Sequence, residues 1–237
     1  MVLLIGPSNG WLYAKGIYSP SKQVKLLGEI NAEALEIALS PEPGRLNPLL
    51  AKREFVDFIY LSLHLPDYEP SGDLEYQVDL ATRLSRLQRA KTAVIHPLNS
   101  PEKYLGEFIN RGVPLAIENM DRGKSSGFKI EELERLVRDF GSGFVLDVQH
   151  AYEHDPTMNY ATELYYALKP HLRHLHVSGQ NSKNNHSLVI NSNNREAILG
   201  FLQKLFIETT VPIILEGEYQ TSEDLKTEID FLRKELA

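Results

Sequence analysis

The sequence contains no cysteine, one tryptophan and three methionines among its 237 residues. The absence of cysteine excludes disulfide bonds, thiolate zinc sites and cysteine nucleophiles, so any bound metal must be held by His, Asp and Glu. No apolar run approaches the roughly 20 residues of a membrane-spanning helix. The N-terminal stretch, Met-Val-Leu-Leu-Ile-Gly-Pro, lacks the basic region of a signal peptide. A cytoplasmic protein without a membrane partner is therefore expected.

An excess of positive charge is also absent. Lys and Arg number 25 against 32 Asp and Glu, and the formal net charge is −7. This balance does not support general binding of nucleic acid, which uses a basic surface, although an acidic protein can carry a local basic groove for DNA. A small molecule is the expected partner. The length suits one TIM barrel, whose usual size is roughly 250 residues, or two smaller domains.

Short apolar runs recur along the chain, separated by longer amphipathic stretches. Most of the runs are continuous rather than alternating, which indicates strands buried on both faces, as in a parallel sheet covered by helices. The sequence predicts eight such strands, at 2–5, 34–39, 58–63, 92–95, 114–117, 143–146, 172–177 and 212–215. Apolar residues at helical spacing predict helices over 74–90, 130–140, 161–168, 195–206 and 222–236.

Strands that alternate with helices along the chain predict an α/β fold, and eight of them predict a (β/α)8 TIM barrel. An open, doubly wound parallel sheet is the structural alternative. Such a sheet usually carries a glycine-rich phosphate loop after its first strand, whereas residues 6–10 read Gly-Pro-Ser-Asn-Gly and do not match GxGxxG. With no linker or low-complexity segment, residues 1–237 are expected to form a single TIM barrel domain.

A His, Asp or Glu stands at the end of each of six consecutive expected strands. These residues are His64, His96, Glu118, Asp147, His176 and Glu216. One such residue is often a helix cap or a hydrogen-bonded histidine, but in a TIM barrel the ends of all the strands meet at one rim. Carboxylates and imidazoles that converge there would repel one another or lose their hydration without a compensating positive charge. The pattern therefore predicts a cluster of divalent metal ions at this rim.

In order and spacing, these motifs resemble the xylose isomerase-like TIM barrel superfamily, and within it the endonuclease IV branch, also called AP endonuclease family 2. The resemblance runs over nearly the whole chain. It rests on His64-Leu-Pro, Ile95-His96-Pro97, Ile117-Glu118-Asn119, Leu146-Asp147-Val-Gln-His150, Leu175-His176 and Pro212-Ile-Ile-Leu-Glu216.

The resemblance implies a site for two or three zinc ions. His64, His96 and Glu118 would hold the first ion, and Glu118 would bridge to a second ion that is completed by Asp147, His176 and Glu216. His150 and His186 would hold the third. The family places an Asp two residues before that last His, whereas this chain has Asn184, a neutral and weaker ligand, so the third ion is in doubt. Manganese, iron or magnesium are alternatives to zinc, because the carboxylate-rich second set is less selective.

Three basic residues stand in loops that are expected at the same rim. Arg122 and Lys124 follow the fifth expected strand, and Lys183 follows the seventh. These side chains could contact a substrate phosphate, and solvated loop positions are an equally good interpretation. His174 lies two residues before His176 and is expected to be a hydrogen-bonded histidine of the barrel interior, with a supporting role beside a metal ligand as the alternative.

Two enzymatic interpretations follow. The first is a metal-dependent phosphoester hydrolase resembling endonuclease IV, in which Glu118 and Glu216 flank the attacking water. A small phosphorylated substrate fits it better than duplex DNA, because the chain is acidic and Asp67 follows His64-Leu-Pro where the family tends to place an aromatic residue. The second is a metal-dependent isomerase or epimerase of sugars or sugar phosphates, with Glu118 and Glu216 as acid and base. A non-catalytic metal-binding protein is the third interpretation.

Overall fold

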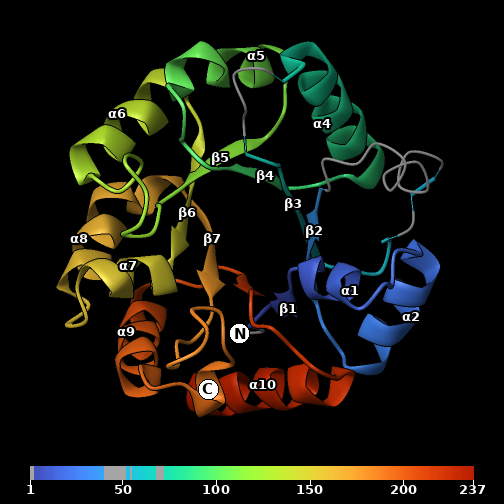
Figure 1. Ribbon diagram of the computed structural model, residues 1–237, viewed down its shortest axis with the longest axis vertical. Helices are drawn as coiled ribbons and strands as arrows, with labels where there is room; N and C mark the ends of the chain where they lie inside the picture. The colour runs from blue at the N-terminus through green and yellow to red at the C-terminus, as the bar shows by residue number, and fades with distance from the viewer. Residues whose placement is uncertain (1–2, 40–51, 54, 68–71) are drawn as a thin grey trace.

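The computed structural model describes residues 3–39, 52–53, 55–67 and 72–237. Its strands are β1 (Ile5–Pro7), β2 (Ala34–Ala38), β3 (Tyr60–His64), β4 (Thr92–Ile95), β5 (Leu115–Glu118), β6 (Gly143–Asp147), β7 (Leu172–Val177) and β8 (Ile213–Leu215). They form one parallel sheet of eight strands in the order β1-β8-β7-β6-β5-β4-β3-β2. The sheet curls into a barrel with helices around it (Figure 1). The predicted (β/α)8 TIM barrel, built as a single domain, is confirmed.

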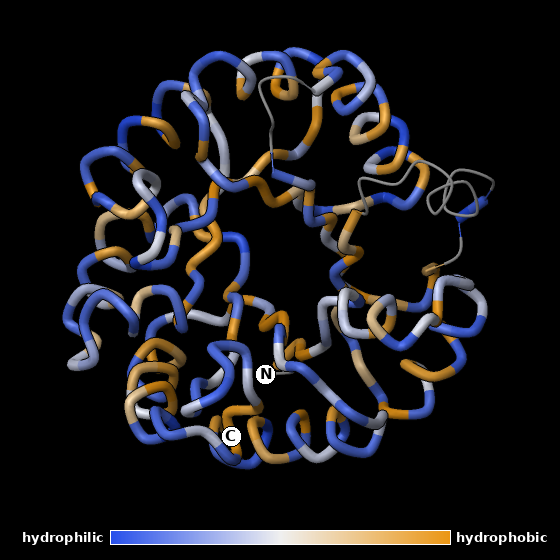
Figure 2. Tube along the Cα trace, in the orientation of Figure 1, coloured by the Kyte–Doolittle hydropathy of each residue, from blue (hydrophilic) through white to orange (hydrophobic). Residues whose placement is uncertain are grey.

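The helices form the outer layer of the barrel. They are α1 (Gly10–Ala14), α2 (Pro20–Glu29), α4 (Leu74–Gln88), α5 (Leu105–Asn110), α6 (Ile130–Phe140), α7 (Val148–His154), α8 (Asn159–Leu168), α9 (Arg195–Glu208) and α10 (Ser222–Glu235), with short 3-10 helices η1 (Pro101–Lys103), η2 (Lys169–His171) and η3 (Val189–Asn191). Apolar segments concentrate on the strands and alternate with polar ones along the helices (Figure 2). Within the described residues, no helix is long and apolar enough to cross a membrane.

The seam between β1 and β2 closes the barrel through a few contacts. Ser8 and Glu36 form an isolated parallel bridge just beyond β1, and the Asn9 N–H donates to the Glu36 carbonyl oxygen at 2.9 Å. Gly6 allows this approach, because a Cβ at this position would lie 1.6 Å from the Ala34 carbonyl oxygen. The two strands therefore come this close only with glycine at position 6.

The elements differ from the sequence predictions mainly at the start of the chain. The first strand was expected at 2–5, but it is Ile5–Pro7, because the register pairs Ile5 with Ile213 and Pro7 with Leu215; Val2 lies outside the described residues. The other strands begin and end within two residues of the predicted bounds, and so do the five predicted helices. Helices α1, α2, α5 and α7 were not predicted. Three of them, α1, α5 and α7, have 5, 6 and 7 residues and are too short to show helical periodicity.

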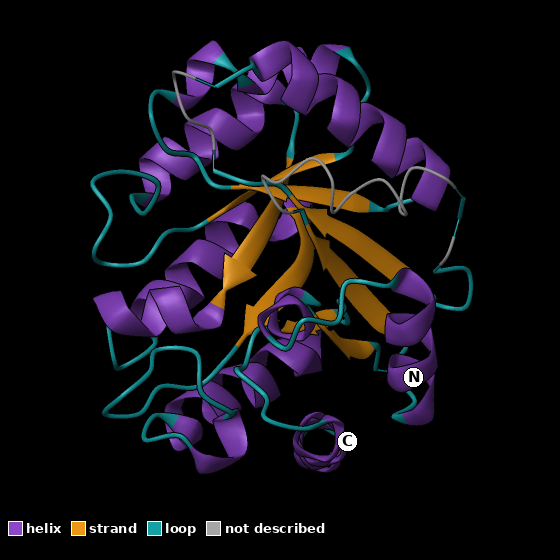
Figure 3. Cartoon of the chain, turned by 45° about the vertical axis from the view of Figure 1, so that its right-hand side comes forward, coloured by secondary structure: helices purple, strands orange, loops and turns teal. Residues whose placement is uncertain are grey.

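All eight strands run in the same direction, so their carboxyl ends meet at one rim (Figure 3). His64, Glu118 and Asp147 are the last residues of β3, β5 and β6. His176 is the last but one in β7, and Glu216 directly follows β8. The parallel topology therefore brings together side chains that are far apart in the sequence.

Glu228 in α10 is a buried carboxylate away from this rim, with 1% of its surface exposed. Its oxygens accept hydrogen bonds from the backbone N–H of Val189 at 2.5 Å and of Ile190 at 3.2 Å, in η3. Burial raises the pKa of Glu228 to about 7, against the lowering effect of these two hydrogen bonds. Glu228 therefore anchors α10 to the segment that follows the β7 loop.

We expect Glu228→Ala to lower the free energy of unfolding by about 2–4 kcal/mol, because it leaves two buried N–H groups without an acceptor. Urea denaturation at neutral pH measures the change. Glu208→Ala is the control, since Glu208 forms an exposed ion pair with Lys169, and such pairs contribute little. Equal losses in the two variants would contradict the anchoring role of Glu228.

Candidate metal centre at the carboxyl-terminal rim

Glu118 lies at the centre of the side chains at the rim and is 1% exposed. Its Oε2 atom lies 3.3 Å from Nε2 of His64 and 3.4 Å from Nε2 of His96. Its Oε1 atom lies 3.2 Å from Nδ1 of His176. The two oxygens of one carboxylate thus face different groups of donors, as in a carboxylate that is shared by two cations.

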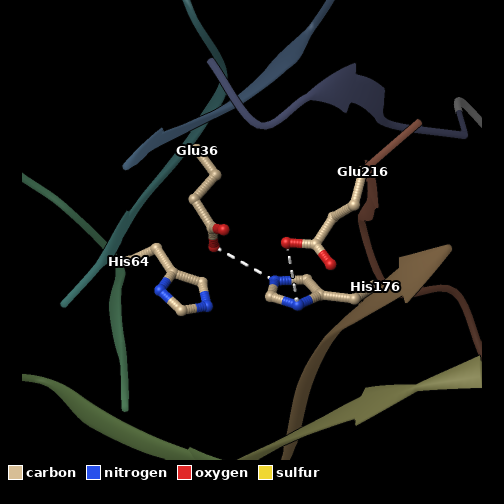
Figure 4. Close-up of side chains that lie close together, drawn as sticks. All are labelled: Glu36, His64, His176 and Glu216. Carbon is tan, nitrogen blue, oxygen red and sulfur yellow. Dashed lines mark hydrogen bonds and ion pairs between the residues drawn. The ribbon is translucent and has the colours of Figure 1, made fainter. Parts of the chain in front are cut away.

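The structure brings together all six residues that stand at the strand ends. The ligand atoms of His64, His96 and Glu118 lie within 4.8 Å of one another, and so do those of Glu118, Asp147, His176 and Glu216. A further overlapping group consists of Glu36, His64, His176 and Glu216 (Figure 4). Each group offers the His and carboxylate donors that bind divalent cations.

Hydrogen bonds on the far side of three histidines orient their rings. The Nδ1–H of His64 donates to the Leu65 carbonyl oxygen at 3.1 Å, and that of His150 donates to the Asn119 carbonyl oxygen at 2.9 Å. The Nδ1–H of His96 donates to Asp67 Oδ1 at 2.5 Å. These acceptors carry no hydrogen, so in the neutral imidazole the lone pair remains on Nε2. Metal-binding histidines commonly have such partners.

The pKa values show how strongly these groups depend on one another's charge. Burial would raise the pKa of Glu118, but the neighbouring His176, His64 and His96 hold it well below its usual value. Burial would lower the pKa of His176, but Glu216 and Glu118 raise it well above its usual value. The pKa of Glu216 is raised by burial and by the negative charges nearby. When no ion is bound, protons on the histidines balance the negative charge of the carboxylates.

Several oxygen and nitrogen atoms that could bind a metal at the rim are buried without a hydrogen-bond partner among the described residues. These atoms are Glu118 Oε2, Asp147 Oδ2 and His176 Nδ1. Buried polar atoms without partners are rare in folded proteins because they are costly. A divalent cation would satisfy these atoms and offset the carboxylate charge, so the residues fit such an ion.

His150 and His186, which the resemblance assigns to a third ion, also lie at this rim. Their ring centroids are 6.1 Å apart. His186 Nδ1 lies 3.3 Å from Ser178 Oγ. The side-chain oxygen of Asn184 accepts the backbone N–H of His186 at 2.7 Å, so it is engaged within its own loop.

The basic residues expected at the rim lie on exposed loops. Arg122 lines a hollow of about 380 Å³ together with Gln180 and Asn185. Lys124 is exposed and lies near enough to Asp67 to contribute to lowering the pKa of that carboxyl, although the His96 hydrogen bond contributes most. Lys183 is exposed in the turn after β7, and its backbone N–H donates to Asn181 Oδ1 at 2.8 Å.

A cavity of about 460 Å³ opens beside Glu216, between the loops that follow β1 and β8. Its lining includes Trp11, Lys15, His186, Glu216 and Tyr219. The rings of Trp11 and Tyr219 meet edge to face, with centroids 5.6 Å apart. A cavity of this volume suits a small molecule, and Glu216 connects it to the metal centre.

Two residues of the centre were missed in the sequence. Glu36 is fully buried in β2 and lies 3.2 Å from His176 Nε2. The sequence carries a signal for Glu36, because a lone carboxylate interrupts the apolar run 34–39. Asp67 orients His96 across 29 residues of chain, and nothing in its local sequence indicates that contact.

A profile of the family described as xylose isomerase-like TIM barrel matches residues 92–235. Endonuclease IV from Thermus thermophilus has 20% sequence identity and a TM-score of 0.67, over 92% of this chain and 94% of that one. A D-tagatose 3-epimerase-like protein has 18% identity and a TM-score of 0.67, over 99% and 100% of the two chains. The 3-keto-D-glucoside 4-epimerase of E. coli has 12% identity and a TM-score of 0.70, over 98% and 100%. No curated protein matches the sequence.

At these identities the three structures share the fold with this chain. Their names refer to different activities: one is an endonuclease, one is a sugar epimerase, and one is described as like a sugar epimerase. The shared fold therefore does not determine the activity of this chain, which depends on the residues at its own rim.

The pH dependence of stability in the metal-free protein should reveal the buried charge at His96. Burial lowers the pKa of His96, but hydrogen bonds with Asp67 and Glu118 outweigh it and raise the pKa to about 10. A raised pKa stabilises the folded protein fully below the unfolded value, about 6.5, and this stabilisation is lost as the pH rises through about 10.

With a chelator present, we expect the unfolding free energy of the wild type to fall between about pH 7 and pH 10. It should fall by roughly 2 kcal/mol more than that of Asp67→Asn, which lacks the carboxylate that contributes most to raising the pKa of His96. Urea denaturation across this range measures both proteins. Parallel curves would show that the Asp67 contact does not hold a proton on His96.

Proposed function

Because this chain belongs to the xylose isomerase-like TIM barrel family, we propose that it is a divalent-metal-dependent enzyme and that it hydrolyses a small phosphorylated substrate. The observation that supports this most is the placement of Glu118, whose Oε2 faces His64 and His96 while Oε1 faces His176. One carboxylate between two sets of donors suits a pair of cations. Two-cation sites are typical of phosphoester hydrolases.

The residues divide into two proposed ion sites that share Glu118. The first consists of His64, His96 and Glu118, and the second of Glu118, Asp147, His176 and Glu216. The imidazole-rich first site favours zinc, whereas manganese, iron or magnesium are alternatives at the carboxylate-rich second site. Bound ions would supply the positive field that activates water and stabilises the charge of a phosphoryl group under attack.

The chain itself supplies the orientation and the proton transfer. Glu118 is buried and held between three histidines, so it keeps a fixed direction. Glu216 is 17% exposed and borders the cavity, so its carboxylate is placed to exchange a proton with a bound molecule. Lys15, in the cavity wall, donates to Gln220 at 2.8 Å and has further N–H groups for a substrate phosphate.

The size and charge of the site favour a small substrate over duplex DNA. The cavity of about 460 Å³ lies within the usual range for small-molecule pockets. The net charge of −7 opposes a broad phosphate backbone. Arg122, Lys124 and Lys183 are separate exposed side chains on two loops, where each could contact one phosphate.

A sugar isomerase or epimerase is the second candidate, and one feature of the cavity favours it. The cavity is lined by Glu216 and His186, while His64 and His96 are not among the lining residues that the structure describes. A substrate there would contact the second set through Glu216. Glu216 would then serve as one member of the acid and base pair, and Glu118, buried behind it, as the other. A non-catalytic metal-binding protein would need neither the cavity nor this pair.

We expect the wild type to hold two or three zinc ions per chain and His96→Ala to lose one of them. Hydrolysis of a nitrophenyl phosphoester should fall by about 100-fold or more in the variant, since several kcal/mol of charge stabilisation are lost. Elemental analysis and steady-state rates measure the two effects. His171→Ala is the control, because His171 lies in η2, before β7 begins.

One ion per chain in the wild type, unaffected by His96→Ala and accompanied by epimerisation of a ketose, would instead support the second candidate. Absence of tightly bound ions under all conditions would reject both enzymatic proposals.

The third ion offers a separate test at Asn184. We expect Asn184→Asp to raise the zinc affinity of the His150 and His186 pair by about 10-fold, because a charged oxygen replaces a neutral one. Competition with a chromophoric chelator measures the gain. Asn185→Asp adds the same charge one residue further and should have a smaller effect, while equal gains would indicate a general charge effect.

A further inference from the structure

His176 is held differently from the other histidines of the rim. Its Nδ1 atom faces the side chains of the proposed second ion site, at 3.2 Å from Glu118 Oε1 and 3.5 Å from Glu216 Oε1. Its Nε2 atom faces the barrel interior, 3.2 Å from Glu36 Oε2 and 3.1 Å from His174 Nε2. His64 and His96 instead present Nε2 to Glu118. For His176, the atom that faces the proposed ion site is Nδ1 (Figure 4).

Glu36 is built into the barrel beneath this site. It lies in the middle of β2 with none of its surface exposed, and Ser62 Oγ donates to its Oε2 at 2.9 Å. Glu36 Oε2 therefore lies between the Ser62 hydroxyl and Nε2 of His176. A carboxylate in this place accepts hydrogen bonds without donating any.

We propose that Glu36 is a positioning residue: it accepts the Nε2–H of His176 and so keeps the Nδ1 lone pair of that histidine directed at the bound ion. The reason is the number of hydrogens that the ring nitrogens of His176 carry. A neutral imidazole carries one N–H. Both nitrogens of His176 face carboxylates, but Glu118 and Glu216 on the Nδ1 side would bind the ion, whereas Glu36 on the Nε2 side is left to accept the hydrogen. The other nitrogen is then free to bind a cation. This inference rests on the metal centre proposed above.

The contacts of His174 agree with this arrangement. If His176 Nε2 carries the hydrogen, His174 Nε2 at 3.1 Å is an acceptor, and the His174 hydrogen is on Nδ1. That Nδ1 lies 2.8 Å from the hydroxyl oxygen of Tyr60, which lies 2.8 Å from Thr92 Oγ1. His174 can then donate to Tyr60, and Tyr60 to Thr92. The two contacts of Tyr60 then have one donor and one acceptor each, while the single N–H of His176 is shared between Glu36 and His174.

Direct binding of the ion by Glu36 is the competing arrangement. A Glu36 oxygen lies within 4.8 Å of ligand atoms of His64, His176 and Glu216. If Glu36 shared an ion with His176 Nε2, the hydrogen of His176 would have to be on Nδ1. The two arrangements therefore differ in which nitrogen of His176 carries the hydrogen.

Nitrogen NMR of the zinc-loaded full chain distinguishes the arrangements in the wild-type protein, and a variant is needed only to assign the signals. Long-range proton–nitrogen correlations report which ring nitrogen is protonated, and His176→Gln identifies the signal of His176. We expect the hydrogen on Nε2 and the metal-bound signal on Nδ1. The opposite pattern would overturn the proposal in favour of direct ligation by Glu36.

Glu36→Gln tests the energetic consequence. The amide keeps the shape of the side chain but can turn its NH2 group to Nε2, which favours the tautomer with the hydrogen on Nδ1. We expect zinc affinity at the second site to fall by about 10- to 100-fold, the usual effect of losing such an outer hydrogen bond. Competition with a chromophoric chelator gives the dissociation constants. The His176 signals should change from one tautomer to a mixture.

Two variants serve as controls for Glu36→Gln. Glu228→Gln makes the same substitution at another buried glutamate, away from the rim. Tyr60→Phe breaks the His174 contact but keeps Glu36 beside His176. Both should bind zinc within about 2- to 3-fold of the wild type. Wild-type affinity in Glu36→Gln would reject this inference alone, whereas a wild type that binds no ion would reject the proposed function as well.

Discussion

The structure depends on positive charge that balances carboxylates buried away from water. Glu36, Glu118 and Asp147 are buried at or below the rim, and Glu216 is mostly covered. Their carboxylates would repel one another in a low-dielectric interior, so positive charge has to be present among them. When no ion is bound, protons on the histidines supply this positive charge. The nearby carboxylates therefore raise the pKa values of His64, His150 and His176, although burial lowers them. A divalent cation would supply the same charge, so protons and metal would compete for the same atoms.

The barrel makes this concentration of charge sterically achievable. The six strands from β3 to β8 each deliver one residue to the rim at or near their carboxyl end, and neighbouring strands keep these residues in register. Glu118 at the end of β5 is the partner of Val145 in β6, and Asp147 at the end of β6 is the partner of His176 in β7. The loops then hold the rings from outside, as Asp67 and the Asn119 carbonyl do. Strands set the positions of the ligating side chains, and loops set which nitrogen of His96 and of His150 faces inwards.

Much of the fold could be predicted from the sequence, because a continuous apolar run indicates a strand buried on both faces regardless of its tertiary partners. The six strand-end residues could be found for a related reason, since parallel strands end at a common rim. The first strand was placed too early because Gly6 and Pro7 are typical of a turn, whereas here the close contact with Ala34 requires the glycine inside the strand. Glu36 and Asp67 escaped prediction, because their roles depend on side-chain contacts across strands and loops that spacing along the chain does not reveal.

The interior of the barrel shows why the polar residues below the rim belong to the centre. Val94, Ala116 and Val145 form a small apolar cluster of their own. Beside them, Ser62 donates to Glu36, Tyr60 contacts His174, and His176 links the two pairs. A barrel that served stability alone could fill both regions with branched apolar side chains, as TIM barrels commonly do. A buried carboxylate is strongly unfavourable unless a donor holds it, and His176 is the donor that links Glu36 to the rim. Because His174 and His176 lie two residues apart on one strand, they face the same side, and β7 thereby connects the interior carboxylate to the proposed ion site.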